Sequence, residues 1–279
     1  MAQTIMAKTI VITGSTKGIG LGLADEFLKR GHNVVISGRR QDVVDAVVAK
    51  LNAAQNAGRA IGIACDVSDI AQVENLWRQS AKVFGRIDIW INNAGIINKY
   101  RNIGQLDPVD ISSVVETNLS GAMNGTKVAA KAMEVQDVIN GTRGAIYNFE
   151  GFGSDGMTRG GMSVYGATKR ALTYFTGAAA KELKTKNIIV GFIQPGIVVT
   201  ELGLGEAWGE PADAVRAKKK FIMMFGDPVA PVAAFIAARV LSNTKPGVRI
   251  NWLTVPKLLW RVLTHKFIKR DPIGAAGLA

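Results

Sequence analysis

Apolar runs of strand length alternate along the chain with longer segments in which apolar residues recur at helical spacing. The strand-like runs are Thr9–Thr13, His32–Ser37, Ala60–Cys65, Ile87–Ile91, Gly144–Phe149 and Ile188–Ile193. The helical segments are Ile19–Arg30, Gln41–Ala57, Asp69–Phe84, Asp107–Met133 and Thr168–Lys184. Because strands that alternate with helices of this length are joined by right-handed crossovers, the pattern predicts an α/β, Rossmann-type doubly wound parallel sheet.

The domain organisation follows from the absence of any internal repeat or Pro/Ser-rich linker within the 279 residues. We therefore expect a single dinucleotide-binding and catalytic domain over residues 1–279. Two segments differ from the regular pattern. Residues 201–226 are rich in glycine and predict a mobile flap, and residues 249–279 predict a basic amphipathic C-terminal segment.

The composition narrows the kinds of site that the chain can build. Cys65 is the only cysteine, and His32 and His265 are the only histidines, so neither a disulfide framework nor a metal site is expected. No stretch of about 18 residues is free of charge, Pro and Gly, which argues against a membrane-spanning helix. We expect a cytoplasmic protein. The net charge of +12 favours anionic ligands or surfaces, but no basic run is interleaved with aromatics, so nucleic acid is not an expected partner.

A glycine-rich loop follows the first strand directly and opens the first helix. It reads Thr13-Gly14-Ser15-Thr16-Lys17-Gly18-Ile19-Gly20. Glycines let backbone amides approach a pyrophosphate, and the N-terminus of the helix adds a favourable dipole. In this strand–turn–helix context the loop predicts dinucleotide binding, whereas a glycine-rich turn without a ligand is the alternative.

The end of the second strand predicts which dinucleotide is bound. A carboxylate at this position would select NAD, but the sequence runs Ser37-Gly38-Arg39-Arg40. Arg39 and Lys17 could pair with a 2′-phosphate, so NADP(H) is the expected cofactor. Arg40 is interpreted as a solvated residue at the start of the next helix.

Tyr165 and Lys169 form a candidate proton-transfer pair, because residues four apart share one face of a helix. A free phenol has a pKa of about 10 and is a poor acid or base near neutral pH. A lysine ammonium one turn away would stabilise the phenolate and lower that pKa.

With these motifs the chain resembles the short-chain dehydrogenases/reductases over roughly residues 8 to 200. Asn92-Asn93-Ala94-Gly95, Asp66-Val67, Asn118-Leu119-Ser120-Gly121 and the segment Pro195 to Thr200 match further family motifs. The resemblance implies that Tyr165 is the general acid, that Lys169 binds the nicotinamide ribose and lowers the tyrosine pKa, and that Asn118 completes a proton relay. The full set of predicted cofactor-binding residues is Gly14, Ser15, Thr16, Lys17, Gly18, Ile19, Gly20, Arg39, Asp66, Val67, Asn93, Ala94, Gly95, Tyr165, Lys169, Pro195, Gly196, Ile197 and Thr200.

One expected residue is missing from this pattern. Family members usually end the fifth strand Asn-x-Ser-Ser, but here it ends Asn148-Phe149-Glu150-Gly151, and the nearest hydroxyl belongs to Ser154. In the favoured hypothesis the glycine-rich turn brings Ser154 to the substrate oxygen as a catalytic residue. In the others, Tyr165 works without this serine, or catalysis is lost. Glu150 as an acid–base group is a further alternative. Residues 148–156 and 165–170 also resemble the chlorophyll b reductases of plants.

The remaining predictions concern substrate and partners. The apolar run Phe221 to Phe225 favours a bulky apolar substrate, or simply packs a helix on the sheet. The stripe Val255, Leu258, Leu259, Val262, Leu263 and Phe267 predicts a C-terminal helix that suits peripheral contact with a membrane surface, its own domain or a partner subunit. The resemblance implies a homo-oligomer, a dimer or tetramer, for which Gly177 to Ala180 offers a small-residue face.

Together these observations predict an NADP(H)-dependent oxidoreductase that reduces an aldehyde or ketone, or oxidises the alcohol, on a fairly apolar small molecule. An NAD-dependent alcohol dehydrogenase and a non-catalytic dinucleotide-binding sensor or scaffold are the two alternatives.

Overall fold

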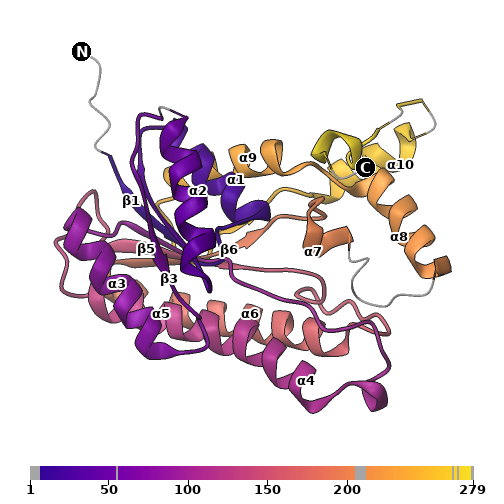
Figure 1. Cartoon of the computed structure of the whole chain (residues 1–279), viewed down its shortest axis with the longest axis horizontal. Helices are drawn as coiled ribbons and strands as arrows, with labels where there is room; N and C mark the ends of the chain where they lie inside the picture. The colour runs from indigo at the N-terminus through magenta and orange to yellow at the C-terminus, as the bar shows by residue number, and fades with distance from the viewer. Residues whose placement is uncertain (1–6, 55, 205–211, 266, 269, 278–279) are drawn as a thin grey trace.

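A seven-stranded sheet forms the centre of the protein, for which a computed structural model describes residues 7–54, 56–204, 212–265, 267–268 and 270–277 (Figure 1). All pairings are parallel, in the order β3-β2-β1-β4-β5-β6-β7. The strands are β1 (Thr9–Ile12), β2 (Asn33–Gly38), β3 (Ala60–Ala64), β4 (Ile89–Asn92), β5 (Gly144–Phe149), β6 (Ile188–Gln194) and β7 (Arg249–Asn251). The predicted doubly wound parallel sheet is confirmed, with the chain reversing its direction of winding between β1 and β4.

Helices cover both faces of the sheet. One face carries α1 (Gly18–Lys29), α2 (Gln41–Ala53) and α9 (Val229–Ser242), and the other carries α3 (Ile70–Phe84), α5 (Gly121–Met133) and α6 (Ser163–Glu182) (Figure 1). Alternate strand residues enter the two cores, because successive side chains point to opposite faces. In β1, Ile10 and Ile12 pack with α1 and α9, while Val11 packs on the opposite side.

Several elements differ from the prediction. α6 begins at Ser163 rather than Thr168, so Tyr165 lies in its first turn. The helix expected over Asp107–Met133 consists of α4 (Pro108–Val115), a π-helical turn at Glu116–Ser120, and α5. The sequence predicted no element for α9 or β7, which complete the sheet and its cover.

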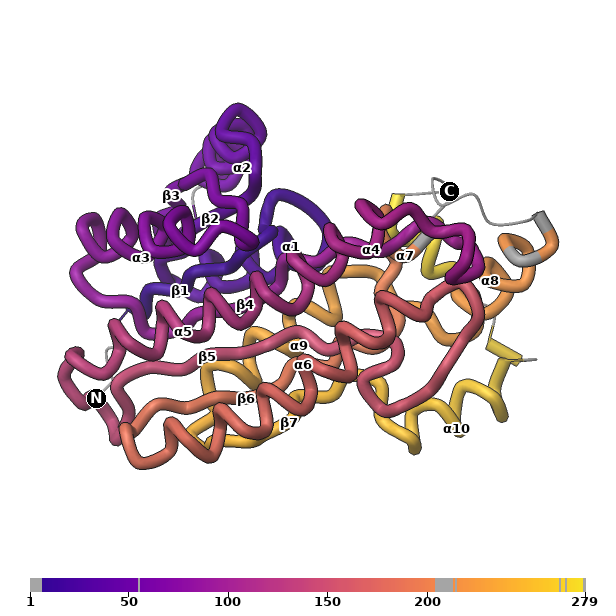
Figure 2. Tube along the Cα trace, turned by 90° about the horizontal axis from the view of Figure 1, so that it is seen from below, coloured from indigo at the N-terminus to yellow at the C-terminus, as the bar shows by residue number. Residues whose placement is uncertain are grey.

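A separate group of short helices lies at one end of the molecule (Figures 1 and 2). It contains α7 (Glu201–Leu204), α8 (Ala212–Phe225), α10 (Val255–Thr264) and a 3₁₀ turn at Gly274–Ala276. The predicted flap thus consists of two helices, and residues 205–211 between them are outside the described ranges. Within those ranges, no helix combines the length and apolar character needed to cross a bilayer.

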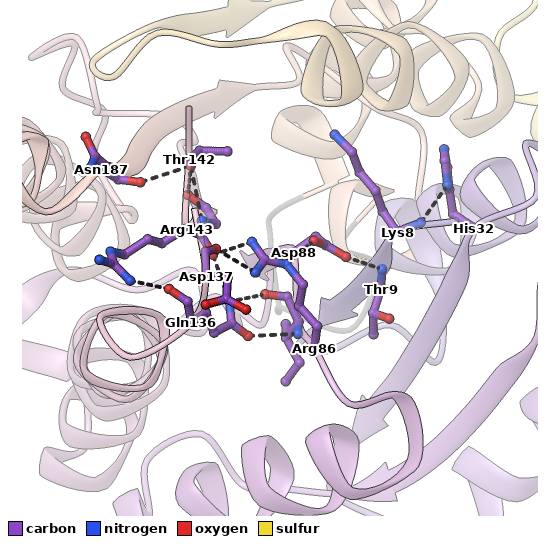
Figure 3. A network of polar contacts seen from close by, with 12 residues as sticks. Lys8, Thr9, His32, Arg86, Asp88, Gln136, Asp137, Thr142, Arg143 and Asn187 are labelled. Carbon is purple, nitrogen blue, oxygen red and sulfur yellow. Dashed lines mark hydrogen bonds and ion pairs between the residues drawn. The ribbon is translucent and has the colours of Figure 1, made fainter. Parts of the chain in front are cut away.

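A network of polar contacts stabilises the edge of the sheet at which the strands begin (Figure 3). Asp88, just before β4, accepts a hydrogen bond from the Thr9 amide at 2.9 Å and pairs with Arg86 at 2.7 Å. The Arg86 guanidinium also donates to the carbonyls of Asp137 and Arg143, at 2.8 and 2.9 Å. This network joins the starts of β1, β4 and β5, and the sequence motifs gather at the other ends of the strands.

Candidate active site

The glycine-rich loop lies against the end of β4. Gly14 has a φ of +63°, and a Cβ added to it would lie 2.8 Å from the Ala94 Cα. A Cβ on Gly20 would lie 2.5 Å from the Asn93 side-chain nitrogen. Only glycine fits both positions, so the backbone is drawn tightly around the start of α1. A loop of this kind, opening onto a helix N-terminus, fits the pyrophosphate of a dinucleotide.

The side chains of Thr13, Ser15 and Asn93 hold this loop in shape, and the last two are predicted to bind the cofactor. The Thr13 hydroxyl accepts hydrogen bonds from the Asn93 and Ala94 amides, both at 3.1 Å. The Asn93 side chain donates to the carbonyls of Thr13 and Gly14, both at 2.9 Å. Ser15 is buried and donates to the Ile12 carbonyl at 2.7 Å. The Asn93 and Ser15 side chains therefore position the loop.

The charged residues near the end of β2 take different partners. Arg39 is exposed, while Arg40 pairs with Asp42 beside the start of α2. Lys17, which the sequence paired with Arg39 on a 2′-phosphate, contacts Glu201 of α7 at 2.7 Å. Both partners in that ion pair are largely exposed, so it contributes little to stability.

Further predicted residues lie at the ends of β3 and β6. Asp66 accepts hydrogen bonds from the amide and hydroxyl of Ser68, and Val67 is buried against Gly121. Pro195, Gly196 and Ile197 follow β6, and the Thr200 methyl would lie 3.5 Å from a Cβ on Gly18. The structure thus brings the segment after β6 beside the glycine-rich loop.

Asn118 lies inside the π-helical turn between α4 and α5 and is buried. Its side chain exchanges two hydrogen bonds with the backbone of Ile96, both at 2.8 Å, and donates to the Thr168 hydroxyl at 3.4 Å. Gly95 lies alongside, where a Cβ would be 3.4 Å from the Asn118 oxygen. Single π turns are frequent at functional sites, and this one directs Asn118 towards α6.

Tyr165 and Lys169 lie one turn apart on α6, and the lysine nitrogen is 5.8 Å from the centre of the tyrosine ring. Burial raises the pKa of the Tyr165 phenol to about 12. Burial lowers the pKa of Lys169 to about 8, and the Glu150 carboxylate acts in the opposite direction. The lysine also donates to the Phe149 carbonyl at 3.0 Å. At neutral pH the phenol is therefore protonated and available as an acid, beside a lysine that is mostly charged.

Gly151 packs directly against this pair. A Cβ at this position would overlap the Tyr165 hydroxyl oxygen and lie 3.4 Å from the lysine Cε. The position where the family pattern has a serine is therefore occupied by backbone, and the tyrosine hydroxyl lies against it.

We expect Gly151→Ala to lower kcat about 10- to 100-fold, because the added methyl would displace the Tyr165 hydroxyl from its position. Steady-state kinetics of carbonyl reduction would measure this loss. Gly166→Ala, on α6, is the matched control, since its Cβ would meet only an ordinary contact at 3.9 Å. An unchanged kcat in Gly151→Ala would contradict the assigned position of the hydroxyl.

Ser154 is buried in the turn that follows Gly151. Its hydroxyl accepts a hydrogen bond from the Gly151 amide at 3.1 Å and lies 3.5 Å from the Lys169 carbonyl. The Ser154 amide donates to the Gly151 carbonyl at 3.1 Å. These contacts stabilise the turn. They do not test whether Ser154 reaches the substrate oxygen, which stays a prediction.

The two other polar residues of this strand end have partners of their own. Glu150 forms a two-pronged ion pair with Arg249 of β7, at 2.7 and 3.0 Å, and accepts from the Thr173 hydroxyl at 2.9 Å. Asn148 bonds to Asn92 on the neighbouring strand at 2.7 Å and to Thr176 on α6 at 2.9 Å. Both residues therefore link the end of β5 to neighbouring strands and to α6.

Two residues that the sequence analysis missed support the site. Asn98 is buried and accepts from the Tyr165 amide at 3.2 Å, which satisfies a free N–H in the first turn of α6. Asp227 exchanges two backbone hydrogen bonds with Ile197 and Val199, both 2.9 Å long. Both bonds hold the segment after β6.

The fold and the arrangement around Tyr165 define the class to which the chain belongs. The family model for short chain dehydrogenases matches residues 8–206, more than half of the chain. The protein is therefore a member of the short-chain dehydrogenase family of oxidoreductases.

Individual relatives show which members of the family this chain is similar to. The chain is 36% identical over 265 residues to the chlorophyll(ide) b reductase NOL of Arabidopsis thaliana, covering 92% of this chain and 73% of the relative. It is 34% identical over 272 residues to the probable chlorophyll(ide) b reductase NYC1 of the same plant, covering 92% of this chain and 53% of the relative. The chain thus spans about half the length of the latter protein. A solved 3-ketoacyl-(acyl-carrier-protein) reductase from Brucella melitensis, complexed with NADH, is 26% identical, with a TM-score of 0.71 and coverage of 87% of this chain and 96% of that one.

Proposed function

We propose that the protein is an NADP(H)-dependent carbonyl reductase that acts on a fairly apolar aldehyde or ketone and, in reverse, oxidises the alcohol. The observation that carries this proposal is the position of the Tyr165 hydroxyl, which lies against Gly151 with Lys169 one helical turn away. A protonated acid beside a cation suits delivery of a proton to a carbonyl oxygen.

Each residue then has a role in the reaction. When bound, the nicotinamide supplies the hydride that reaches the carbonyl carbon. Tyr165 donates its hydroxyl proton to the carbonyl oxygen, and the Lys169 ammonium stabilises the phenolate that remains. Asn118 holds the Ile96 segment beside α6 and belongs to the route by which the proton is replaced. Ser154 is the candidate for polarising the carbonyl.

The proposed substrate class rests on two observations. The names of the two plant relatives describe reduction of chlorophyll(ide) b. Phe221 and Phe225 of α8 place their rings 5.0 Å apart, and Phe221 is 52% exposed. Aromatic and methionine side chains here offer an apolar surface to a bulky ligand.

The proposed preference for NADP(H) rests on Arg39, which is exposed at the end of β2 where no carboxylate is present. An NAD-dependent alcohol dehydrogenase is a second candidate, because Lys17 contacts Glu201 in this structure. If that ion pair persists, Arg39 is left as the main partner for a 2′-phosphate.

We expect Arg39→Asp to reduce the preference for NADPH over NADH about 10- to 100-fold, through the loss of charge-assisted hydrogen bonds to the 2′-phosphate. The ratio of kcat/KM values for the two cofactors measures this preference. Arg40→Asp is the matched control, since the Arg40 side chain pairs with Asp42. A wild-type preference for NADH, or equal effects of the two substitutions, would contradict the assignment of Arg39.

We also propose a homo-oligomer, on the family resemblance. Ala179 and Ala180, from the small-residue face predicted to permit subunit packing, are buried in the core of their own chain. An apolar cavity of about 410 Å³ lies between α4 and α6, and its lining includes Ile111, Val115 and Val164. An apolar surface of this kind is a candidate position for a second copy.

A further inference from the structure

Helix α10 turns a charged residue inwards. Arg261 is the buried residue of this helix, with 6% of its surface exposed. Its guanidinium donates to both carboxylate oxygens of Asp227 at 2.7 Å and to the Phe225 carbonyl at 2.6 Å. Arginine stays charged in proteins, so this paired contact fixes which side of α10 faces the domain.

The outer side of α10 is apolar. Leu259, Trp260 and Leu263 are 59%, 62% and 73% exposed, and Phe267 just beyond the helix is 86% exposed. Val255, Val262 and Ile268 extend the same exposed set. An amphipathic helix of a globular domain normally turns its apolar stripe to the core, and here the orientation is reversed. Exposed apolar surface gathered in this way marks an interaction site.

The sequence around this apolar surface is basic. Residues 249–279 contain six basic residues and one acidic residue, and three of the six, Arg249, Arg261 and Arg270, pair with the carboxylates of Glu150 and Asp227. α8, which lies beside α10 at the same end of the molecule, adds the exposed Arg216 and Lys220 (Figures 1 and 2). A second copy of this chain would bring a like-charged surface against it, which disfavours self-association through α10. A surface with apolar side chains among cations complements a bilayer that contains acidic phospholipids.

We propose that α10, together with residues 267–268, is a docking surface for an anionic lipid bilayer. The apolar side chains enter the boundary between headgroups and acyl chains, with Trp260 at headgroup level, while the neighbouring cations meet lipid phosphates. The Arg261–Asp227 contact keeps the helix in this orientation. The docking surface is independent of the chemistry proposed for Tyr165.

The test uses the full chain and two kinds of phospholipid vesicle. We expect co-flotation with vesicles of phosphatidylcholine and phosphatidylglycerol, little with phosphatidylcholine alone, and release as salt is raised. Trp260→Ser combined with Leu263→Ser should lower the partition coefficient at least about tenfold, because two apolar side chains no longer enter the bilayer. Both positions are exposed, so circular dichroism and thermal melting should match the wild type.

The matched control is Val135→Ser combined with Val138→Ser, at positions 85% and 45% exposed. These residues flank Gln136 and Asp137, which belong to the network where the strands begin (Figure 3). This variant should float like the wild type. Absence of flotation, equal loss in the control, or binding that ignores salt would overturn the proposal. Light scattering that shows an α10-dependent dimer without lipid binding would assign the surface to a second copy instead. Both variants should reduce a water-soluble aldehyde at the wild-type rate when no vesicles are present. A loss of membrane binding is thereby distinguished from a failure of the proposed carbonyl reduction.

Discussion

Tyr165→Phe should lower kcat for carbonyl reduction about 10²- to 10⁴-fold, the usual contribution of a positioned general acid. The substitution removes the hydroxyl that lies against Gly151 and keeps the ring that packs beside Lys169. Binding of NADPH, measured by fluorescence titration, should stay within a few-fold of the wild type, since the ring and the glycine-rich loop are retained. NADPH consumption over a panel of aldehydes and ketones measures the loss.

Tyr174→Phe is the matched control, because Tyr174 lies on the same helix and is 83% exposed. It should leave the kinetics unchanged. If Tyr165→Phe kept more than about a tenth of the activity, another group would have to supply the proton. A wild type that binds NADPH but reduces no carbonyl in the panel would favour the non-catalytic sensor or scaffold.

Ser154→Ala in the same assay distinguishes two roles for that hydroxyl. A loss of roughly 10²-fold or more would place it on the substrate oxygen, as expected for a donor that stabilises developing negative charge. A small loss of activity with a lower melting temperature would assign it to the turn, where it accepts from the Gly151 amide.

Much of the site could be predicted because it depends on local spacing. The glycine-rich loop, Asn93 and Tyr165 lie at strand ends or helix starts, and a parallel sheet brings its strand ends to one edge. Asn118 lies within the helical segment between β4 and β5. The confirmed fold and family follow from the same periodicity. The spacing of Tyr165 and Lys169 needs only the helix that contains both.

The partners of these residues could not be predicted, because they come from distant parts of the chain. Glu150 and Arg249 are 99 residues apart, and the Tyr165 amide donates to the Asn98 side chain, which is 67 residues away. No periodic pattern marks such pairs. Gly151 illustrates a different limit. The sequence indicates a missing serine, but only the packed backbone explains why a side chain is excluded there. Similarly, the apolar stripe of α10 could be predicted, but not that it faces outwards.

Asp227→Ala should be the most destabilising of the substitutions considered. The Asp227 carboxylate lies between Arg261 and Arg270, at 2.7 Å from each, and accepts from the Trp252 indole at 2.6 Å. Removing it leaves the almost fully buried Arg261 guanidinium without its counter-charge, which typically costs about 3–5 kcal/mol. For a domain of this size that corresponds to a melting temperature lower by about 6–20 °C. Differential scanning calorimetry would measure the shift.

Two comparisons show whether the unpaired arginine causes the lower melting temperature of Asp227→Ala. Glu134→Ala removes a surface ion pair with Lys186, in which the glutamate side chain is 40% exposed and the lysine side chain 54%. This substitution should change the melting temperature by no more than a few degrees. Arg261→Met combined with Asp227→Ala should be less destabilised than the sum of the single changes, because the buried charge is then gone. Additive effects in this double-mutant cycle would show that the pair itself contributes little.

The same substitution should also weaken cofactor binding, because Asp227 links the C-terminal helix to the site. Its backbone pairs with Ile197 and Val199, next to the residues predicted to hold the nicotinamide, while its carboxylate holds Arg261 and Arg270. Those arginines also donate to the carbonyls of Met224, Phe225 and Gly226 at the end of α8. Loosening Asp227 therefore releases the end of α8 and the segment after β6 together. We expect a several-fold higher Kd for NADPH in Asp227→Ala, measured well below its melting temperature, and no change in Glu134→Ala. An unchanged Kd would show that Asp227 stabilises the C-terminal helices but does not affect the binding of NADPH.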